Sequence, residues 1–297
     1  MNMIWYWVNR YVFYHLPPVW HTNVVFLINC IRLRKPFYWQ QIDNPRTFTE
    51  KLNWLKLYGM RPEYARLADK YEVRDFVENR IGDTYLVPLK GVYPTAQEIP
   101  WEDLPTPVVL KATHGSGMNI FVRNRDQQDV KLVRRQFNRW FAINPYYLSR
   151  EWQYRKIRPR ILAEELLGDN VPDYKFFCFR GRVRYIQLDV DRFVNHKRNL
   201  YTRDWELLAG AYNYPKSSQV YTAPEQLQEM IGLAERLAEG FEFLRVDFLI
   251  AGSLIYFGEL TFFPGGGAEP FDSFEFDYEF AKEWNPVVHQ NTDVPVR

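Results

Sequence analysis

Charged residues close a series of short apolar segments in this chain, and their order constrains the fold more than any other feature. One apolar segment ends in Lys111 and leads into a glycine turn, and a later one ends in Glu164 and Glu165. A further segment carries Asp173 and Lys175, and a hairpin of two strands completes the series. The predicted strands and helices alternate without the regular spacing of βαβ units. We therefore expect an α+β fold with two lobes built on mainly antiparallel sheets.

Cap and turn signals set the element boundaries. Thr47 and Glu50 form a capping box that predicts a helix ending at Gly59, and Asp69 marks a break in the helix that follows. The strands are expected at 85–93, 107–112, 120–123, 160–166, 173–179 and 182–188, the later helices at 126–141 and 225–239, and a final hairpin turn at 251–253. We expect a helical N-terminal flank over residues 1–60 and a main domain over 61–290. Its small lobe would span about 105–166 and its large lobe about 167–290.

Composition excludes several classes of protein. The 297 residues carry a net charge of only +2, which excludes a whole-protein footprint for nucleic acid. The two cysteines, Cys30 and Cys178, form neither a disulfide framework nor a zinc site, and a reducing cytoplasm is the expected compartment.

The N-terminal 45 residues are apolar and aromatic. The uncharged run 11–31 is long enough to span a bilayer, but Pro17 and Pro18 interrupt it, so we expect no spanning helix. Two interpretations remain: a helical flank packed on the main body, which we favour, or a peripheral contact with the inner face of the membrane. In the second, Trp and Tyr rings would act together with Arg32, Arg34 and Lys35.

Lysines and glycines form a candidate polyphosphate site. Glycines let backbone N–H groups approach phosphate oxygens, while a lysine supplies countercharge. Lys175 lies between apolar neighbours and is a second candidate phosphate contact, although an ion pair with Glu164 or Glu165 would also satisfy it. The candidate phosphate-binding residues are Lys111, His114, Gly115, Ser116, Gly117 and Lys175. The alternative for the first five is an ordinary hairpin turn.

Four acidic residues and one threonine complete the candidate ATP site. Glu164 and Glu165 end an apolar strand, where a carboxylate can hold a ribose hydroxyl beside an adenine edge, or simply reach solvent. On the final hairpin, Asp247, Glu259 and Thr261 offer oxygen ligands from adjacent strands, as Mg²⁺ requires. The alternative is a pair of edge acids. Together these groups favour a site that binds ATP and uses its γ-phosphate.

Further polar residues are candidates for phosphoryl transfer and substrate binding. Arg245 shares a strand face with Asp247 and would stabilise a transferring phosphoryl group. The candidate substrate residues are Asp189, Asp191, Arg192, His196, Arg198, Gly265 and Gly266. Asp189 and Asp191 also form a D-x-D pair typical of metal-dependent glycosyltransferases, although a solvated loop would explain them equally.

The order of these pieces resembles the ATP-grasp superfamily, and more closely the TupA-like ATP-grasp proteins of bacterial surface-polysaccharide pathways. The residues that carry the closer match are Phe48-Thr49-Glu50-Lys51-Leu52, Asp69-Lys70-Tyr71, Val109-Leu110-Lys111 with His114-Gly115-Ser116-Gly117, Arg150-Glu151-Trp152-Gln153-Tyr154, Asp173-Tyr174-Lys175-Phe176-Phe177-Cys178-Phe179 and Phe257-Gly258-Glu259-Leu260-Thr261-Phe262. They extend over roughly residues 45–272.

The resemblance implies two lobes that clasp ATP and Mg²⁺. By position, Lys111 and Lys175 would contact phosphates, Glu164 and Glu165 would border adenine and ribose, Asp247 and Glu259 would bind Mg²⁺, and Arg245 and Lys175 would be the catalytic residues. Thr261 departs from the pattern, since related ligases have Asn there, which puts a second metal ion in doubt.

The implied activity is an ATP-dependent carboxylate–amine ligase that forms an amide through an acyl phosphate. The family context suggests a glycan or small-molecule carboxylate, such as a uronic acid, and an amino-acid amine. Two alternatives remain open: an ATP-grasp kinase for a sugar or polyol, and a metal-dependent glycosyltransferase that uses Asp189 and Asp191.

Overall fold

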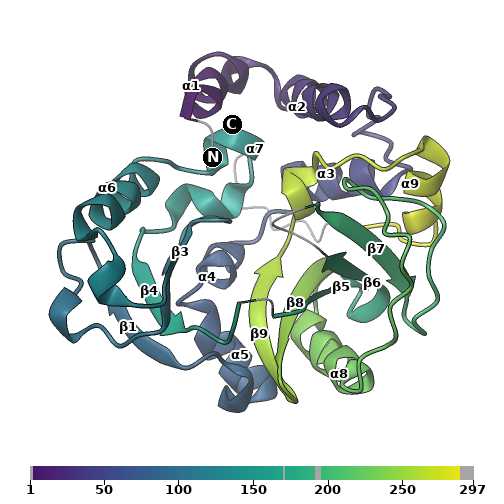
Figure 1. Cartoon of the computed structure of the whole chain (residues 1–297). Coiled ribbons are helices and arrows are strands. Elements are labelled where there is room, and N and C mark those ends of the chain that lie inside the picture. The colour runs from purple at the N-terminus through teal and green to yellow at the C-terminus, as the bar shows by residue number, and fades with distance from the viewer. Residues whose placement is uncertain (1–2, 170, 191–194, 288–297) are drawn as a thin grey trace.

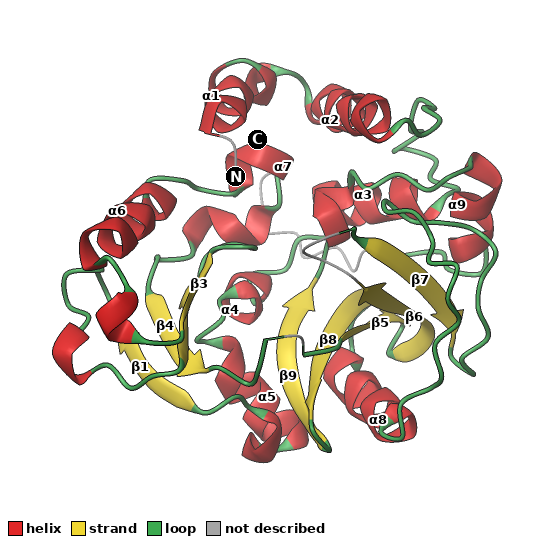
Figure 2. Cartoon of the chain, viewed as in Figure 1, coloured by secondary structure: helices red, strands yellow, loops and turns green. Residues whose placement is uncertain are grey.

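The protein consists of two lobes, each built on its own antiparallel sheet. The computed structural model describes residues 3–169, 171–190 and 195–287. The two sheets lie side by side with helices between and around them (Figure 1; Figure 2). Two antiparallel sheets with helices confirm the predicted α+β class.

The smaller lobe contains a four-stranded sheet in the order β1-β4-β2-β3. Its elements are β1 (Leu89–Tyr93), β2 (Val108–Ala112), β3 (Asn119–Val122), β4 (Ile161–Glu165), α6 (Val130–Phe141) and α7 (Tyr146–Ser149). Val133 and Phe137 of α6 are buried against Leu110 and Ala163 of the sheet, because apolar residues three or four apart share one helix face. The sheet begins with β1, which lies before residue 105, where we expected this lobe to start.

The larger lobe contains a five-stranded sheet in the order β7-β6-β5-β8-β9. Its elements are β5 (Asp173–Phe179), β6 (Arg182–Val190), β7 (Lys197–Thr202), β8 (Phe243–Ala251), β9 (Leu254–Thr261), α8 (Leu227–Ala238) and α9 (Phe274–Ala281). β5 lies at the centre of the sheet and is buried along its whole length. Any charged side chain on it is therefore withdrawn from water and requires a partner.

Helix α3 (Phe48–Tyr58) begins at the predicted capping box, in which Thr47 Oγ1 accepts a hydrogen bond from Glu50 N at 3.1 Å. Phe48 packs among rings of the larger lobe, including Phe243 and Phe280. The helix thus belongs to the core of the larger lobe, although it falls within the expected N-terminal flank.

Two short helices, α4 (Tyr64–Ala68) and α5 (Val73–Ile81), lie between the lobes (Figure 1). The predicted break separates them, and Asp69 Oδ1 accepts hydrogen bonds from Tyr71 N at 2.8 Å and Glu72 N at 3.1 Å. Six single 3₁₀ segments complete the described secondary structure: Phe13–His15, Asp83–Tyr85, Trp101–Asp103, Arg125–Gln127, Trp152–Lys156 and Pro264–Gly267.

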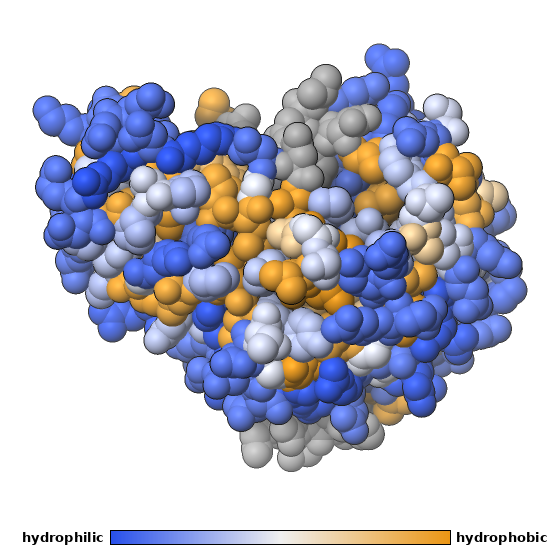
Figure 3. Space-filling view, turned by 60° about the horizontal axis from the view of Figure 1, so that its bottom comes forward, coloured by the Kyte–Doolittle hydropathy of each residue, from blue (hydrophilic) through white to orange (hydrophobic). Residues whose placement is uncertain are grey.

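The N-terminal segment forms α1 (Met3–Tyr11) and α2 (Pro18–Leu33), which lie along one edge of the molecule (Figure 1). In the described part of the chain, no helix has both the length and the apolar character needed to cross a membrane. Figure 3 shows the molecule turned so that the bottom of Figure 1 comes forward. On this face the edges of the molecule are mainly hydrophilic, and hydrophobic residues gather toward the middle.

Candidate functional site

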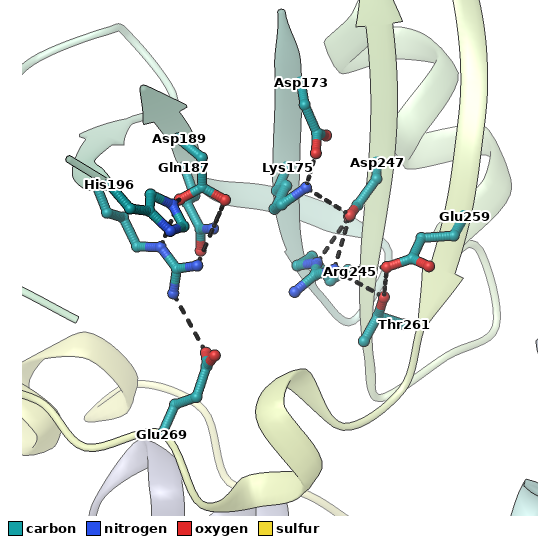
Figure 4. Close-up of polar contacts among 11 residues, drawn as sticks. Asp173, Lys175, Gln187, Asp189, His196, Arg245, Asp247, Glu259, Thr261 and Glu269 are labelled. Atoms are coloured by element: carbon teal, nitrogen blue, oxygen red, sulfur yellow. Dashed lines mark hydrogen bonds and ion pairs between the residues drawn. The ribbon is translucent and has the colours of Figure 1, made fainter. Parts of the chain in front are cut away.

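The larger lobe places a buried lysine between two carboxylates. Lys175 on β5 lies directly opposite Asp247 on β8, and its Nζ is 3.0 Å from Asp247 Oδ2. Nζ also donates to Asp173 Oδ2 on the same face of β5 (Figure 4). Although burial alone would lower it, the pKa of Lys175 is raised by the two carboxylates, so the ammonium stays charged. The alternative considered for Lys175, an ion pair with Glu164 or Glu165, does not form; its partners are Asp173 and Asp247.

Arg245 joins the same cluster from β8. Its Nε and Nη2 each lie 2.7 Å from an oxygen of Asp247, which gives a bidentate pair. Nη2 also lies 3.0 Å from Glu259 Oε1 and from Thr261 Oγ1 (Figure 4). Burial opposes ionisation of Glu259, but Arg245 and the nearby lysines lower its pKa, so the Glu259 carboxylate stays charged.

A β-bulge sets the position of Glu259. The pairing of β8 with β9 runs from Phe248 opposite Phe257 directly to Asp247 opposite Glu259, and Gly258 is the extra residue. A Cβ on Gly258 would lie 3.1 Å from Asp247 O, so the close approach of the strands favours glycine. Phe257 faces the core, whereas Glu259 and Thr261 face the charged cluster.

The donor set of this cluster fits a hard divalent cation. Two carboxylates and a hydroxyl from adjacent strands are oxygen ligands on rigid elements, and phosphate and water would complete an octahedron. Among the described residues, no group of three or more His, Cys, Asp and Glu side chains could hold a metal by itself.

The smaller lobe contributes a second charged pair. Lys111 Nζ on β2 lies 2.6 Å from Glu164 Oε2 on β4, and Arg74 Nη1 lies 2.8 Å from the other oxygen. Glu165 points to the opposite face of β4, as strand alternation requires, and pairs with Lys90 at 2.8 Å. The two acids at this strand end therefore have separate surroundings, and of the two only Glu164 adjoins Lys111.

The glycine turn projects from the smaller sheet between β2 and β3. Ser116 and Gly117 are exposed at its tip, and Gly117 has a φ of 70°, which favours glycine. His114 is buried, and its Nε2 lies 3.1 Å from Trp140 O, so its ring belongs to the lobe core. Burial lowers the pKa of His114 and keeps it neutral. The tip of the turn, rather than His114, is available to a phosphate.

Lys70 is a third lysine at this site, and it was absent from the candidates drawn from the sequence. It follows Asp69 in the break between α4 and α5, and its Nζ donates to Gly115 O at 2.5 Å. Burial lowers its pKa, while Glu259, Asp69 and Glu164 act on it in the opposite sense. No carboxylate of the described residues lies within ion-pair distance of it. The glycine turn thus brings a half-buried ammonium close to Lys111 and Glu259, where an anion would be favoured.

A second polar cluster lies beside the first one, on β6 and β7. Asp189 stands opposite Arg198, whose Nε is 2.7 Å from Asp189 Oδ1. Arg198 Nη1 lies 3.3 Å from Glu269 Oε2, and His196 Nε2 lies 3.2 Å from Asp189 (Figure 4). His196 and Arg198 hold the pKa of Asp189 well below its usual range against the effect of burial.

Asp189 is therefore already paired within the protein, and it is a strand residue rather than part of a solvated loop. Asp191 and Arg192 lie outside the described residues. Glu269, which also accepts a hydrogen bond from Asn213 Nδ2 at 2.8 Å, was not a candidate from the sequence. The charge of Glu269 helps to raise the pKa of Arg245, so the two clusters interact electrostatically.

The glycine run after β9 forms a tight turn against the base of α3. Gly265 and Gly266 both have positive φ values, and Lys56 Nζ donates to Gly266 O at 2.6 Å. A Cβ on Gly266 would lie 2.6 Å from Ser149 Cβ, so this glycine permits close contact between the lobes. Beside it, burial raises the pKa of Glu151 to about 7.

A cleft of about 580 Å³ opens between the lobes on the side of α5. Its lining includes Tyr71 and Arg74 from the helical connection, Leu89 from β1 and Tyr256 from β9. Arg74 lines this cleft and also donates to Glu164, the carboxylate that pairs with Lys111.

The sequence of this chain matches one family model. The family model described as "TupA-like ATPgrasp" matches residues 50–284, which is most of the chain. The chain belongs to the TupA-like ATP-grasp family. This confirms the resemblance and the predicted ATP-grasp fold.

Several solved structures are similar to this ATP-grasp chain. An N5-carboxyaminoimidazole ribonucleotide synthetase in complex with ADP has 14% identity and a TM-score of 0.42, covering 69% of this chain and 46% of that one. A D-alanine–D-alanine ligase from Bacillus anthracis with ATP has 12% identity and a TM-score of 0.40, with coverages of 67% and 54%. An L-amino acid ligase from Bacillus licheniformis has 14% identity and a TM-score of 0.41, with coverages of 70% and 44%. The chain spans about half the length of these proteins. The comparison with curated proteins gave no match.

Proposed function

We propose that this ATP-grasp protein is an ATP- and Mg²⁺-dependent carboxylate–amine ligase. The observation that carries the proposal is the convergence of cations from both lobes around two charged carboxylates. Lys175 and Arg245 lie on the larger lobe beside Asp247 and Glu259, while Lys70 and Lys111 approach from the side of the glycine turn. Buried cations of this density suit a polyphosphate better than a neutral ligand.

The proposed reaction has two steps. In the first, a carboxylate oxygen of the substrate attacks the γ-phosphorus of ATP, the bond to the β,γ-bridging oxygen breaks, and ADP leaves with an acyl phosphate formed. In the second, an amine attacks the acyl carbon, phosphate leaves and the nitrogen loses a proton. No side-chain nucleophile is required. Lys175 and Arg245 would neutralise negative charge that develops on the transferred group.

Asp247 and Glu259 would hold the Mg²⁺, with Thr261 beside them. When bound, the ion would supply positive charge between the phosphates and orient them for in-line transfer. The lysines hold phosphate oxygens in place, and the exposed tip of the glycine turn at Ser116 and Gly117 would cover them.

The substrate class is part of the proposal. Family resemblance suggests a carboxylate of a surface polysaccharide or its precursor, such as a uronic acid, and an amino-acid amine, in the cytoplasm. Arg198 is paired with Asp189 and Glu269, so it would bind an anionic substrate only if that substrate displaced Glu269. Arg245 is likewise paired, with Asp247 and Glu259, whereas Gly265 is exposed and is the better candidate for contact with the reacting carboxylate.

Isotope transfer tests the proposal. Wild-type protein is incubated with ATP, Mg²⁺, an amine and a uronic acid whose carboxylate oxygens are ¹⁸O-labelled. A ligase moves one ¹⁸O atom into the released phosphate, because the carboxylate oxygen becomes the bridge of the acyl phosphate. A kinase releases no phosphate and phosphorylates the acceptor, which would contradict the proposal. Lys175→Met, compared with wild type in stability as well as in activity, is the inactive control.

The glycosyltransferase alternative receives less support because the family model that matches the chain describes ATP-grasp proteins. Pairing does not decide between the two sites, since Asp189 accepts from Arg198 at 2.7 Å and from Gln187 at 3.0 Å, and Asp247 is likewise paired with Arg245 and Lys175. A thermal shift with UDP-sugars but not with Mg²⁺-ATP would favour that alternative.

A further inference from the structure

The N-terminal segment combines exposed apolar side chains with an absence of acidic ones. Residues 1–42 contain four of the 38 Lys and Arg residues and none of the 36 Asp and Glu residues, so the rest of the chain has 34 basic and 36 acidic side chains. Eight of the 17 large hydrophobic side chains that are exposed among the described residues lie in this segment: Ile4, Trp7, Tyr11, Val12, Trp20, Ile31, Phe37 and Trp39. Exposed apolar side chains gathered in this way usually mark a contact surface.

The exposed residues of α1 lie on one face of the helix. Ile4, Trp7 and Tyr11 follow the spacing i, i+3, i+7, and the rings of Trp7 and Tyr11 are stacked with centroids 5.6 Å apart. The opposite face is fixed to the smaller lobe, where Tyr6 is fully buried and its hydroxyl accepts a hydrogen bond from Asn144 N at 3.2 Å. The aromatic face is therefore held outward.

Helix α2 has the same organisation. Trp20 and Ile31 are 11 residues apart, which is close to three full turns, so both lie on the outer face and are 55% and 69% exposed. The inner face contains buried Phe26 and Cys30. Asn29 Nδ2 donates to Ala268 O at 3.0 Å and fixes the helix to the larger lobe. A helix that is apolar on its solvent face as well as its inner face lacks a partner on the outside.

Basic residues adjoin these apolar faces. Arg32 and Arg34 are exposed at the C-terminal end of α2, immediately beside Ile31, and Lys35 is half-buried. Arg10 lies among the rings of α1, with its Cζ 5.7 Å from the centre of Trp7. The surface thus offers apolar rings, aliphatic side chains and positive charge, with no acid in the segment to repel an anionic partner.

We propose that the outer faces of α1 and α2, together with Arg32, Arg34 and Lys35, bind the surface of an anionic lipid bilayer. The apolar side chains would enter the boundary between headgroups and acyl chains, and the basic side chains would contact the anionic headgroups. The 16 residues of α2 are fewer than the roughly 20 that span a bilayer, so the helices lie in the interface. Both helices run along one edge of the molecule, which lets them meet a flat surface together (Figure 1).

Vesicle co-sedimentation of the full chain tests this proposal and requires no ATP, so its outcome is independent of the proposed ligase activity. Vesicles of phosphatidylglycerol and phosphatidylcholine are compared with vesicles of phosphatidylcholine alone. The expected result is binding at least tenfold tighter to the anionic vesicles, which weakens as salt rises from 0.05 to 0.5 M. Equal sedimentation with both vesicle types, or none with either, would overturn the proposal.

Matched variants locate the surface. Ile4→Glu combined with Ile31→Glu replaces side chains that are 74% and 69% exposed, and should weaken vesicle binding by about tenfold or more. Leu132→Glu combined with Val220→Glu is the control, since those side chains are 60% and 69% exposed outside the segment, and should leave binding unchanged. Arg32→Gln with Arg34→Gln should weaken binding about 25-fold, at roughly fivefold per charge.

Two readouts separate the lipid surface from other outcomes. All variants should keep the wild-type melting temperature, because each changed side chain is largely exposed. Sedimentation velocity without lipid should give the same mass for wild type and for the Ile4→Glu, Ile31→Glu variant. A wild-type dimer that this variant abolishes would identify the surface as a self-interface and overturn the proposal.

Discussion

Lys175 Nζ lies 3.0 Å from Asp247 Oδ2 across the central strand pair of the larger lobe. The same ammonium also contacts Asp173, so one lysine compensates two buried carboxylates. Its role in the proposed site is therefore inseparable from the stability of the sheet. A loss of activity on substituting this lysine has meaning only if stability is measured beside it.

Replacing Lys175 with Met should destabilise the protein by about 3–5 kcal/mol, because it breaks the buried ion pairs that Lys175 makes with Asp173 and Asp247. Urea denaturation followed by tryptophan fluorescence measures this change. The double variant Lys175→Met, Asp173→Asn should recover part of the stability but none of the Mg²⁺-ATP binding. Full stability of the single variant would contradict the buried pair.

Replacing Lys70 with Met should separate stability from ligand binding. The half-buried ammonium costs free energy in the unliganded protein, so the variant should unfold no more easily than wild type. Its affinity for Mg²⁺-ATP should fall about tenfold or more, as expected for the loss of a charge-assisted hydrogen bond. Calorimetric titration measures the affinity, and Lys90→Met, which breaks the pair with Glu165, is the control that should bind normally.

Replacing Asp189 with Asn should lower stability and leave nucleotide binding unchanged, the reverse of the result expected for Lys70→Met. Removing this carboxylate leaves Arg198 buried with only Glu269 as its acidic partner, which should cost about 3 kcal/mol of stability. Nucleotide affinity should stay within about twofold of wild type, whereas Asp247→Asn should abolish it. Loss of Mg²⁺-ATP binding in the Asp189 variant alone would show that the cluster on β6 and β7 is the nucleotide site.

Acid sensitivity should depend on His21. This side chain is buried in α2, neither ring nitrogen has a partner among the described residues, and burial lowers its pKa to about 3, with Arg150 and Lys56 adding to the effect. The unfolded chain binds a proton near pH 6.5 while the folded chain does not, so stability is lost as pH falls from 6.5 toward 3.

Between pH 6.5 and pH 5 this group alone should remove about 2 kcal/mol from the free energy of unfolding. His21→Leu should flatten that part of the pH profile, measured by urea denaturation at each pH. His15→Gln, a change at an exposed position in the same segment, should leave the profile as in wild type. An unaltered slope in the His21 variant would refute the assignment.

Periodicity and turn chemistry predict most of the fold. Local signals predict four features that the structure has. These are the capping box at Thr47, the break at Asp69, the hairpin that carries the glycine turn and the hairpin at Gly252. β7 was missed because its buried residues include Arg198, and a charged residue is read as a loop unless its partner on the next strand is known.

The candidate site, like the fold, could be predicted from the sequence only in part. That Lys175 has a partner was predictable, because a charged residue inside an apolar strand requires one, but the sequence did not identify Asp247 as that partner. Lys70 was not predictable, because its sequence neighbours signal only a helix break, and its burial comes from the glycine turn of the other lobe. His114 shows the converse: it belongs to the motif, but its ring packs in the core.

Helices α1 and α2 are attached to different lobes. Arg150 Nη2, beside α7, donates to Tyr14 O and Leu16 O between the two helices, while Asn29 joins α2 to the turn after β9. The segment is thus a further connection between lobes that the chain already joins through residues 59–88 and 166–172. A ligand that alters the spacing of the lobes must therefore also alter the contacts of this segment. By thermodynamic reciprocity, a partner that binds the segment changes the affinity for that ligand by the same factor by which the ligand changes the affinity for the partner.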